Sequence, residues 1–230
     1  MPLRLIPKGT VVSVLSGVNR GCKWIVGSAS THSSWIGTFE AARASDLQKL
    51  IQPGTIAYDL GANVGYYTLA LSSLVGHTGH VFAFEPEARN VDFLRRHIKL
   101  NNLRNVTVIQ AAVSNSRDLI SFEGSRESGR IGAGGSYRIP SISLDEFMTA
   151  GNPEPSFIKM DIEGAERLAL DGARVILTKA TALWMVGTHS PQLRADCREI
   201  FRNHGYKIVK DSSRRDPGES NEFLALPNSD

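Results

Sequence analysis

The chain has 230 residues, of which 41% are hydrophobic and 21% are charged. These proportions are typical of a globular domain and exclude a disordered or fibrous protein, and the length allows a hydrophobic core without disulfides or metals as staples. The formal net charge of +3 is far below the dense Lys and Arg stripe of a dedicated nucleic-acid binder, so nucleic acid is disfavoured as a partner.

Cys22 and Cys197 are the two cysteines, and neither belongs to a Cys-x-x-Cys pair. This pattern argues against a disulfide framework or a zinc site and indicates a reducing compartment. The N-terminal segment contains Pro2 and Pro7 and lacks the apolar core of a signal peptide. No uninterrupted apolar run reaches the roughly 18 residues that span a bilayer. We therefore expect a cytoplasmic protein without a membrane span.

Residues 1–54 are predicted to form an N-terminal hairpin and a helix that pack on the main domain, which comprises residues 55–230. Short apolar runs at 11–15 and 23–26 flank a turn and read as the two strands of the hairpin. Residues 40–51 have the apolar spacing of a helix, which a Pro-Gly pair ends.

From residue 55 onward, apolar strand-like runs alternate with helical patterns. This alternation predicts an α/β domain with a mostly parallel sheet covered by helices on both faces. The expected sheet has about seven strands, at residues 55–60, 80–84, 106–110, 155–160, 182–186, 206–210 and 222–226. The expected helices are 66–74, 87–100, 165–177 and 192–203. Residues 119–122 are predicted to add an edge strand.

Residues 124–138 break this rhythm. They are rich in Gly and Ser, show no periodicity and carry Arg126, Arg130 and Arg138, which predicts a mobile loop. Two interpretations remain open: a lid whose arginines grip a phosphate, carboxylate or sugar hydroxyls, or a solvated linker.

The strand at 55–60 leads into a glycine-rich turn, at the place where open α/β sheets bind ligands. Asp59 at the strand tip is expected to pair with an ammonium group, and Gly61 and Gly65 let an amino-acid moiety approach the backbone because they lack a Cβ. Glu85 ends the next strand, where a carboxylate accepts hydrogen bonds from both hydroxyls of a ribose. Together these features predict a site for an adenosine-containing cofactor.

The turn departs from the Gly-x-Gly-x-x-Gly pattern of dinucleotide sites. Asn63 stands at the position of the second glycine, which lets pyrophosphate approach, and Tyr66 stands at the third. A cofactor without phosphate is therefore favoured, and a nicotinamide-dependent dehydrogenase is disfavoured. The competing interpretation is a simple tight turn, with Glu85 as a solvated strand end.

These residues resemble the FkbM family of S-adenosylmethionine-dependent methyltransferases. The resemblance covers about half of the chain, from Tyr58 to Ala173, and its most specific element is the string Lys-x-Asp-x-Glu-Gly-x-Glu at 159–166. It also includes the segments 81–86, 111–114, 143–147 and 170–173. The resemblance implies the class I methyltransferase fold, a Rossmann-like seven-stranded sheet, with S-adenosyl-L-methionine as the cofactor.

The resemblance further implies which residues line the cofactor site: Asp59, Gly61, Asn63, Gly65, Glu85, Gln110, Ala111 and Asp161. Of these, Asp161 is expected beside the methyl group, and Gln110 and Ala111 near the adenine. Tyr66 is a further candidate for a cofactor contact, although packing of its helix explains this residue equally well.

Asp161, Glu163 and His189 form the expected catalytic cluster, because all three follow strands that end at one edge of the sheet. Methyl transfer needs alignment of nucleophile and methyl carbon, and a hydroxyl nucleophile gains from a base or a divalent cation. Either His189 is the general base with Asp161 orienting it, the reading we favour, or the three residues bind a magnesium-like ion. A third interpretation makes His189 a structural residue at the end of its strand. Members of the family often carry an acidic residue where this chain has Gly187, and this departure weakens the case for a catalytic or metal-binding His189.

Two neighbours in the same string are assigned structural roles. Glu166 is expected to be a first-turn carboxylate that interacts with the helix dipole. Lys159 is expected to point to the face opposite to that of Asp161's chain neighbours and to be structural, because side chains alternate along a strand.

The sequence therefore favours an O-methyltransferase that acts on a hydroxyl of a small molecule, sugar or glycan. An RNA methyltransferase is the alternative enzyme, disfavoured because an Asn-Pro-Pro-Tyr type of motif and a basic-aromatic patch are missing. A noncatalytic module that binds S-adenosylmethionine is the alternative of another class. The identity of the acceptor, metal dependence and oligomeric state are left open.

Overall fold

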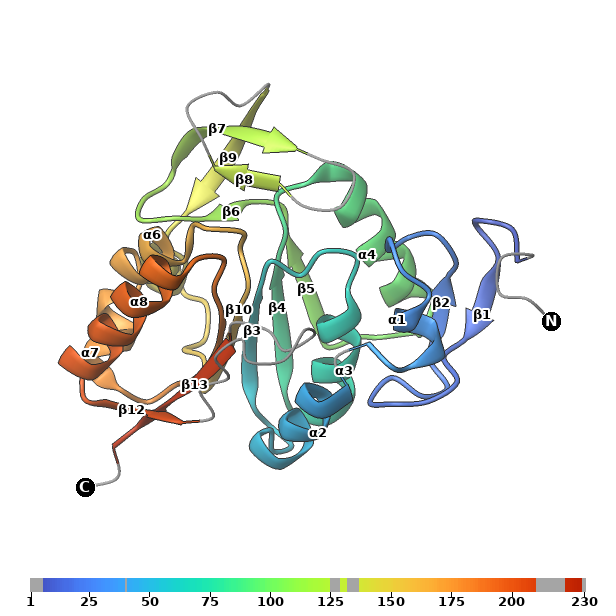
Figure 1. Ribbon diagram of the computed structural model, residues 1–230, viewed down its shortest axis with the longest axis horizontal. Coiled ribbons are helices and arrows are strands. Elements are labelled where there is room, and N and C mark those ends of the chain that lie inside the picture. The colour runs from blue at the N-terminus through green and yellow to red at the C-terminus, as the bar shows by residue number, and fades with distance from the viewer. Residues whose placement is uncertain (1–5, 40, 125–128, 132–136, 210–221, 229–230) are drawn as a thin grey trace.

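The computed structural model describes residues 6–39, 41–124, 129–131, 137–209 and 222–228. Its centre is a seven-stranded sheet in the order β12-β13-β11-β10-β3-β4-β5 (Figure 1). Only β13 runs antiparallel to its neighbours. The strands are β3 (Ile56–Leu60), β4 (His80–Phe84), β5 (Val106–Ile109), β10 (Phe157–Met160), β11 (Leu183–Gly187), β12 (Tyr206–Val209) and β13 (Glu222–Pro227). All seven predicted strands and the mostly parallel α/β sheet are confirmed.

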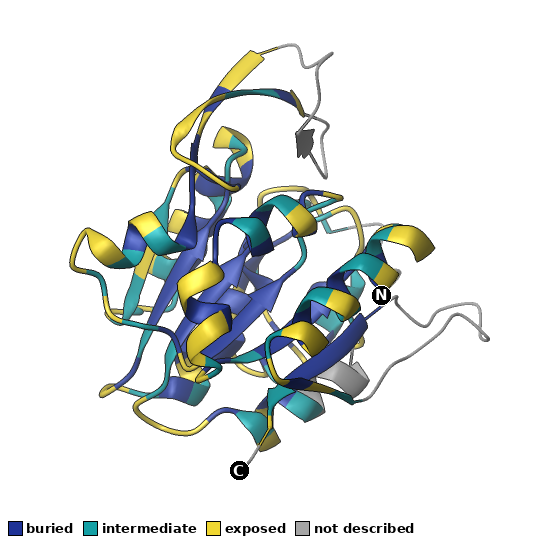
Figure 2. Cartoon of the chain, turned by 90° about the vertical axis from the view of Figure 1, so that its left-hand side faces the viewer, coloured by how far each residue is buried: buried dark blue, intermediate teal, exposed yellow. Residues whose placement is uncertain are grey.

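Helices cover both faces of this sheet (Figure 1). On one face lie α2 (Ala41–Leu50), α3 (Tyr66–Val75) and α4 (Ala88–Leu100), and on the other lie α6 (Glu166–Asp171), α7 (Arg174–Lys179) and α8 (Pro191–Asn203). Successive side chains of a strand point to opposite faces of the sheet, so each face has its own hydrophobic core. In β3, for example, Ala57 belongs to the core on the α3 side and Tyr58 to the core on the opposite side. The strands are accordingly buried, whereas the helices keep exposed outer faces (Figure 2). In the described part of the chain, no helix has the length and apolar character needed to cross a membrane.

The prediction of one helix over residues 165–177 is wrong, because the chain turns between α6 and α7. The turn occurs at Gly172, where a Cβ would lie 2.2 Å from the backbone oxygen of Ser114. The helix α5 (Leu144–Thr149) was not predicted, although Ser143 and Glu146 form a capping box at its start.

The prediction of a mobile loop over 124–138 is wrong for the part that the structure describes. There β6 (Ala112–Val113), β9 (Tyr137–Ile142), β7 (Asp118–Gly124) and β8 (Gly129–Ile131) form a second sheet in that order. The strand expected at 119–122 belongs to this sheet. The Arg138 guanidinium donates a hydrogen bond to the backbone oxygen of Leu119, so Arg138 braces the sheet, while Arg126 lies outside the described residues.

The N-terminal hairpin is confirmed as β1 (Val11–Ser13) paired antiparallel with β2 (Lys23–Ile25), and a short helix α1 (Ser33–Ile36) follows it. The domain boundary at residue 54 stays a prediction. Two hydrogen bonds tie this segment to α3: the Asn19 amide donates to the backbone oxygen of Tyr66 at 2.8 Å, and the Tyr66 hydroxyl donates to that of Phe39 at 2.8 Å.

His97 of α4 is the buried link between the hairpin and the rest of the fold. Its Nε2 accepts a hydrogen bond from the Ile25 N–H at 3.0 Å, and its Nδ1–H donates to the Val64 carbonyl at 2.7 Å. The ring stacks on Trp24 with centroids 4.2 Å apart. Burial lowers the pKa of His97 to about 4, so the neutral ring makes both bonds.

Because the pKa of His97 falls from its ordinary 6.5 to about 4 on folding, its contribution to stability is complete above pH 6.5 and is lost as the pH falls through about 4. The pKa difference corresponds to about 3 kcal/mol of unfolding free energy. We expect denaturant unfolding of the wild type to show this loss, and His97→Gln to show a flatter pH dependence by that amount. Equal pH dependences in the two proteins would contradict the assignment.

Candidate active site

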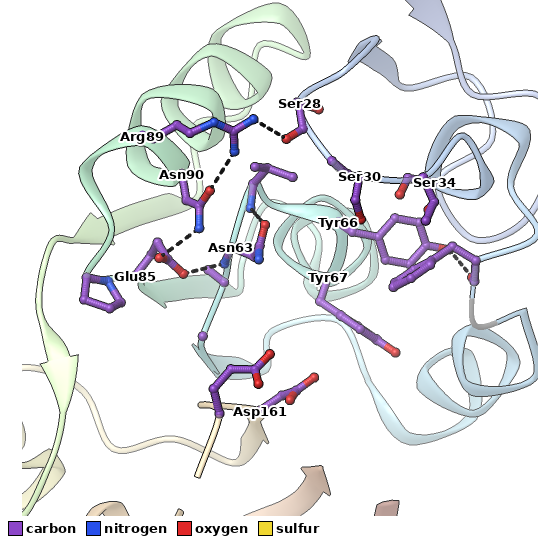
Figure 3. A pocket seen from close by; sticks show the side chains of 18 of the residues that line it. Ser28, Ser30, Ser34, Asn63, Tyr66, Tyr67, Glu85, Arg89, Asn90 and Asp161 are labelled. Carbon is purple, nitrogen blue, oxygen red and sulfur yellow. Dashed lines mark hydrogen bonds between the residues drawn. The ribbon is translucent and has the colours of Figure 1, made fainter. Parts of the chain in front are cut away.

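A cavity of about 710 Å³ opens beyond the carboxyl ends of β3, β4 and β10 (Figure 3). This is the size and place of a ligand site in an open α/β sheet. One side is formed by the turn after β3, by residues 84–86 after β4, by residues 111–113 and by the turn after β10. The other side is formed by residues between Ile6 and Phe39.

The glycine turn after β3 fits tightly against the end of β10. Gly61 has φ of +79°, and a Cβ on it would lie 2.0 Å from the backbone oxygen of Asp161. Gly65 has φ of +100°, and a Cβ there would lie 2.6 Å from Cδ1 of Leu94. Asn63 also adopts a left-handed conformation, and its Oδ1 accepts a hydrogen bond from the Val64 N–H at 2.7 Å. Packing against the end of β10 therefore requires a glycine at residue 61, whereas Gly65 packs against the side chain of Leu94 in α4.

Three of the predicted cofactor residues, Asp59, Gly65 and Gln110, do not line the cavity. Asp59 is fully buried beneath the turn, where its Oδ2 accepts a hydrogen bond from the Thr68 hydroxyl at 2.6 Å. Burial raises the pKa of Asp59 above its usual range. The expected direct pairing of Asp59 with an ammonium group in the cavity does not fit this position. Gln110 is exposed at the end of β5, and Ala111 beside it does line the cavity.

Glu85 faces the cavity from the end of β4 and is held by three protein donors. Its Oε2 accepts from the Asn63 N–H at 2.8 Å, and its Oε1 accepts from the Asn90 amide at 3.3 Å (Figure 3). Oε1 also accepts from the Glu87 N–H at 3.0 Å. Burial raises the pKa of Glu85, and these hydrogen bonds act in the opposite direction. The carboxylate is thus fixed in position, with lone pairs left for a ligand.

The structure brings Asp161, Glu163 and His189 together, as their positions after β10 and β11 predict. Nε2 of His189 lies 3.4 Å from Oδ1 of Asp161 and 3.3 Å from Oε2 of Glu163. The two carboxylate residues line the cavity, whereas His189 lies behind them, outside its lining. Among the described residues, no group of three or more His, Cys, Asp or Glu side chains is arranged to hold a metal ion.

Glu166 is central to this cluster, contrary to its expected role as a simple first-turn carboxylate. It is fully buried, and its Oε1 lies 3.1 Å from Nδ1 of His189. The same oxygen accepts hydrogen bonds from the N–H groups of Ile162 at 3.3 Å and Gly164 at 3.2 Å. Glu166 therefore fixes the turn, in which Glu163 has an unusual φ of +57°, and it orients the imidazole.

The surrounding carboxylates raise the pKa of His189 to about 9. The hydrogen bond to Glu166 is the largest cause, the negative charges of Asp161 and Glu163 add to it, and burial opposes it. At neutral pH the ring is therefore a cation with both N–H groups directed at carboxylates. A protonated imidazole cannot accept a proton, so this geometry favours a positioning role for His189 over the base role.

Lys159 lies in the site, where the sequence analysis expected only a structural residue. Its Nζ is 3.5 Å from Oδ2 of Asp161 and 4.6 Å from the centroid of the Tyr67 ring, and the side chain is buried and lines the cavity. Residues 159 and 161 are two apart, so strand alternation already places their side chains on the same face. The sequence therefore contained the signal that brings Lys159 beside Asp161.

Comparison with known proteins identifies the family of this site. Residues 59–208 match the Methyltransferase FkbM domain. The chain belongs to the FkbM methyltransferase family. A search of curated proteins finds no match.

The solved structures similar to this FkbM chain share its fold at low sequence identity. An FkbM methyltransferase from Methylobacillus flagellatus KT is 18% identical with a TM-score of 0.54, over 86% of this chain and 56% of that one, so our chain spans little more than half of its length. A precorrin-6y C5,15-methyltransferase from Geobacter metallireducens GS-15 is 19% identical with a TM-score of 0.54, over 87% and 94%. Fibrillarin from Aeropyrum pernix, solved with bound S-adenosyl-L-methionine, is 14% identical with a TM-score of 0.51, over 76% and 67%. The class I methyltransferase fold is thereby confirmed.

The contact between Gly61 and Asp161 predicts a large cost for a Cβ at residue 61. Gly205 is a matched control, since its φ of +77° is nearly the same and nothing lies within 4 Å of a Cβ there. We expect Gly205→Ala to lose about 1–2 kcal/mol of unfolding free energy through backbone strain and Gly61→Ala about 1–3 kcal/mol more through overpacking. Equal losses in denaturant unfolding would show that the close approach is unimportant.

The contributions of the surrounding carboxylates predict which substitution lowers the pKa of His189 most. Glu166→Gln removes the largest cause of the raised pKa, so we expect NMR titration of the imidazole protons to show the pKa falling from about 9 by about one unit or more. Glu163→Gln, the control at the same cluster, is expected to lower it less. A larger effect of Glu163→Gln would contradict the proposed arrangement.

Proposed function

We propose that the chain transfers a methyl group from S-adenosyl-L-methionine to a hydroxyl of a small molecule, sugar or glycan. The observation that carries this proposal is a single cavity lined by three features. They are the glycine turn, which lacks the pattern of a phosphate-binding loop, the Glu85 carboxylate and the Asp161 carboxylate. Membership of the FkbM family supports methyl transfer as the reaction.

The residues of the cavity fit S-adenosylmethionine better than a dinucleotide. Glu85 is oriented to accept hydrogen bonds from ribose hydroxyls, and the apolar residues Ala111, Val113 and Phe122 suit an adenine. Gly61 lines the cavity at the turn, while Asn63 stands where pyrophosphate needs a glycine. S-adenosylmethionine has no phosphate, so it does not need the phosphate-binding turn that this chain lacks.

Asp161 is the residue we assign to the acceptor hydroxyl. When bound, S-adenosylmethionine supplies an electrophilic methyl group whose transfer to oxygen leaves a neutral thioether. Asp161 accepts the hydrogen bond of the hydroxyl and takes its proton as the oxygen–carbon bond forms. His189, held by Glu166, and Lys159 place two cations beside this carboxylate and fix its orientation. Glu163 lines the cavity on the same turn and shares the His189 cation.

Substituting Asp161 separates an enzyme from a binding module. We expect Asp161→Asn to lower kcat by about 10²- to 10⁴-fold, the usual worth of a positioned acid–base group, and to leave the Kd of S-adenosylhomocysteine within about threefold, because this ligand lacks the reacting methyl group. The measurement is transfer of labelled methyl to a panel of sugars, sugar nucleotides and alcohols. Asp92→Asn, at an exposed helix position, is the control and is expected to behave as the wild type.

Two outcomes would overturn this proposal. Label that appears only in RNA would contradict the substrate class. Full turnover by Asp161→Asn would contradict the role of the carboxylate.

A further inference from the structure

The cavity has a second wall that precedes the segment matched by the family. We call the cavity-lining residues between Ile6 and Phe39 the N-terminal wall. The family match begins at residue 59, and the described residues assigned above to cofactor and catalysis all follow that point. The N-terminal wall is therefore the part of the cavity left for a second ligand.

The N-terminal wall is held in place by contacts with α3 and α4, the helices that follow β3 and β4. His97 of α4 holds it through Ile25 and Trp24, and the Arg89 guanidinium donates to the Ser28 carbonyl at 3.1 Å. Gly37 allows a close approach inside the segment, since a Cβ there would lie 1.9 Å from the Ser16 carbonyl oxygen. These contacts fix the wall before any ligand arrives, which reduces the ordering cost of binding.

Two hydroxyl groups on this wall line the cavity and make no hydrogen bond with the described residues. Ser34 is a buried residue and Ser30 an exposed one, and both line the cavity (Figure 3). Both hydroxyls are therefore open to a ligand in the cavity. Both groups can donate and accept, which suits a ligand that carries hydroxyls of its own.

Aromatic rings line the same part of the cavity beside these hydroxyls. Tyr66 meets Trp24, Phe39 and Tyr67 in edge-to-face contacts, with ring centroids 6.4, 4.9 and 5.5 Å apart, and all four residues line the cavity. Among the described residues of the N-terminal wall, Lys8 is the only Lys, Arg, Asp or Glu. A wall of neutral hydroxyls and aromatic rings matches a molecule that is polar around its rim, apolar on its faces and uncharged.

We propose that the N-terminal wall binds the acceptor, that the acceptor is a neutral sugar ring, and that Ser30 and Ser34 determine this specificity. This inference rests on the proposed O-methyl transfer and narrows its acceptor class. The sugar hydroxyls pair with Ser30 and Ser34, and one ring face lies against the aromatic residues.

The experiment combines binding and turnover on the full chain loaded with S-adenosylhomocysteine or S-adenosylmethionine. The probes are methyl glycosides of common hexoses, apolar macrocyclic alcohols and a short RNA, with saturation-transfer NMR for binding and labelled methyl for turnover. Ser30→Ala and Ser34→Ala are each expected to raise KM for the methylated glycoside about 3- to 10-fold, with kcat and the Kd of S-adenosylhomocysteine unchanged. Thr38→Ala, exposed in the same segment and outside the cavity lining, is the matched control.

The outcomes separate this inference from the function on which it rests. Glycosides that neither bind nor accept label overturn the sugar assignment, even where a macrocyclic alcohol is methylated. Glycosides methylated with unchanged KM in both Ser variants overturn the assignment of the wall, and unchanged thermal midpoints exclude misfolding as the cause of a raised KM. No methylation of any hydroxyl compound, with S-adenosylmethionine bound, would overturn the proposed function itself.

Discussion

The contact between Gly61 and the backbone oxygen of Asp161 fixes the distance between the glycine turn and the carboxylate cluster. A Cβ would lie 2.0 Å from that oxygen, so the ends of β3 and β10 approach as closely as backbone permits. The glycine turn also positions the Asn63 N–H, which donates a hydrogen bond to Glu85. One packing constraint therefore sets both ends of the cavity, and the chemistry assigned to each end depends on this spacing.

Two histidines, one buried and one partly exposed, show how the surroundings determine whether an imidazole ring is neutral or charged. His97 meets a backbone N–H, a carbonyl and the face of Trp24, so burial dominates and its pKa falls to about 4. His189 meets three carboxylates, so hydrogen bonding and charge dominate and its pKa rises to about 9. The neutral ring fastens the N-terminal wall to the turn, and the cation supports the carboxylates that face the cavity. Neither role requires proton transfer in the ring near neutral pH.

The seven strands of the main sheet were predictable because each is a short apolar run bounded by Gly, Pro or polar residues. The glycine turn and Glu85 were predictable from spacing. The second sheet was not, because its segment is rich in Gly and Ser and β9 contains Pro140. The role of Glu166 also escaped prediction, because Glu166 enters the site only where the chain turns at 161–165, and the pKa of His189 depends on that same turn. Lys159 was predictable, since it lies two residues before Asp161 and therefore on the same strand face. The N-terminal wall has no local pattern, since distant residues assemble it.

Calorimetric titration with S-adenosylhomocysteine and with a nicotinamide dinucleotide tests the central claim, that the cavity over β3 and β4 is built for an adenosyl amino acid without phosphate. The account predicts saturable binding of S-adenosylhomocysteine at one site, weakened by Glu85→Gln because the ribose loses its charged acceptor, and no comparable binding of the dinucleotide. Tight uptake of the dinucleotide together with no heat from S-adenosylhomocysteine would contradict it.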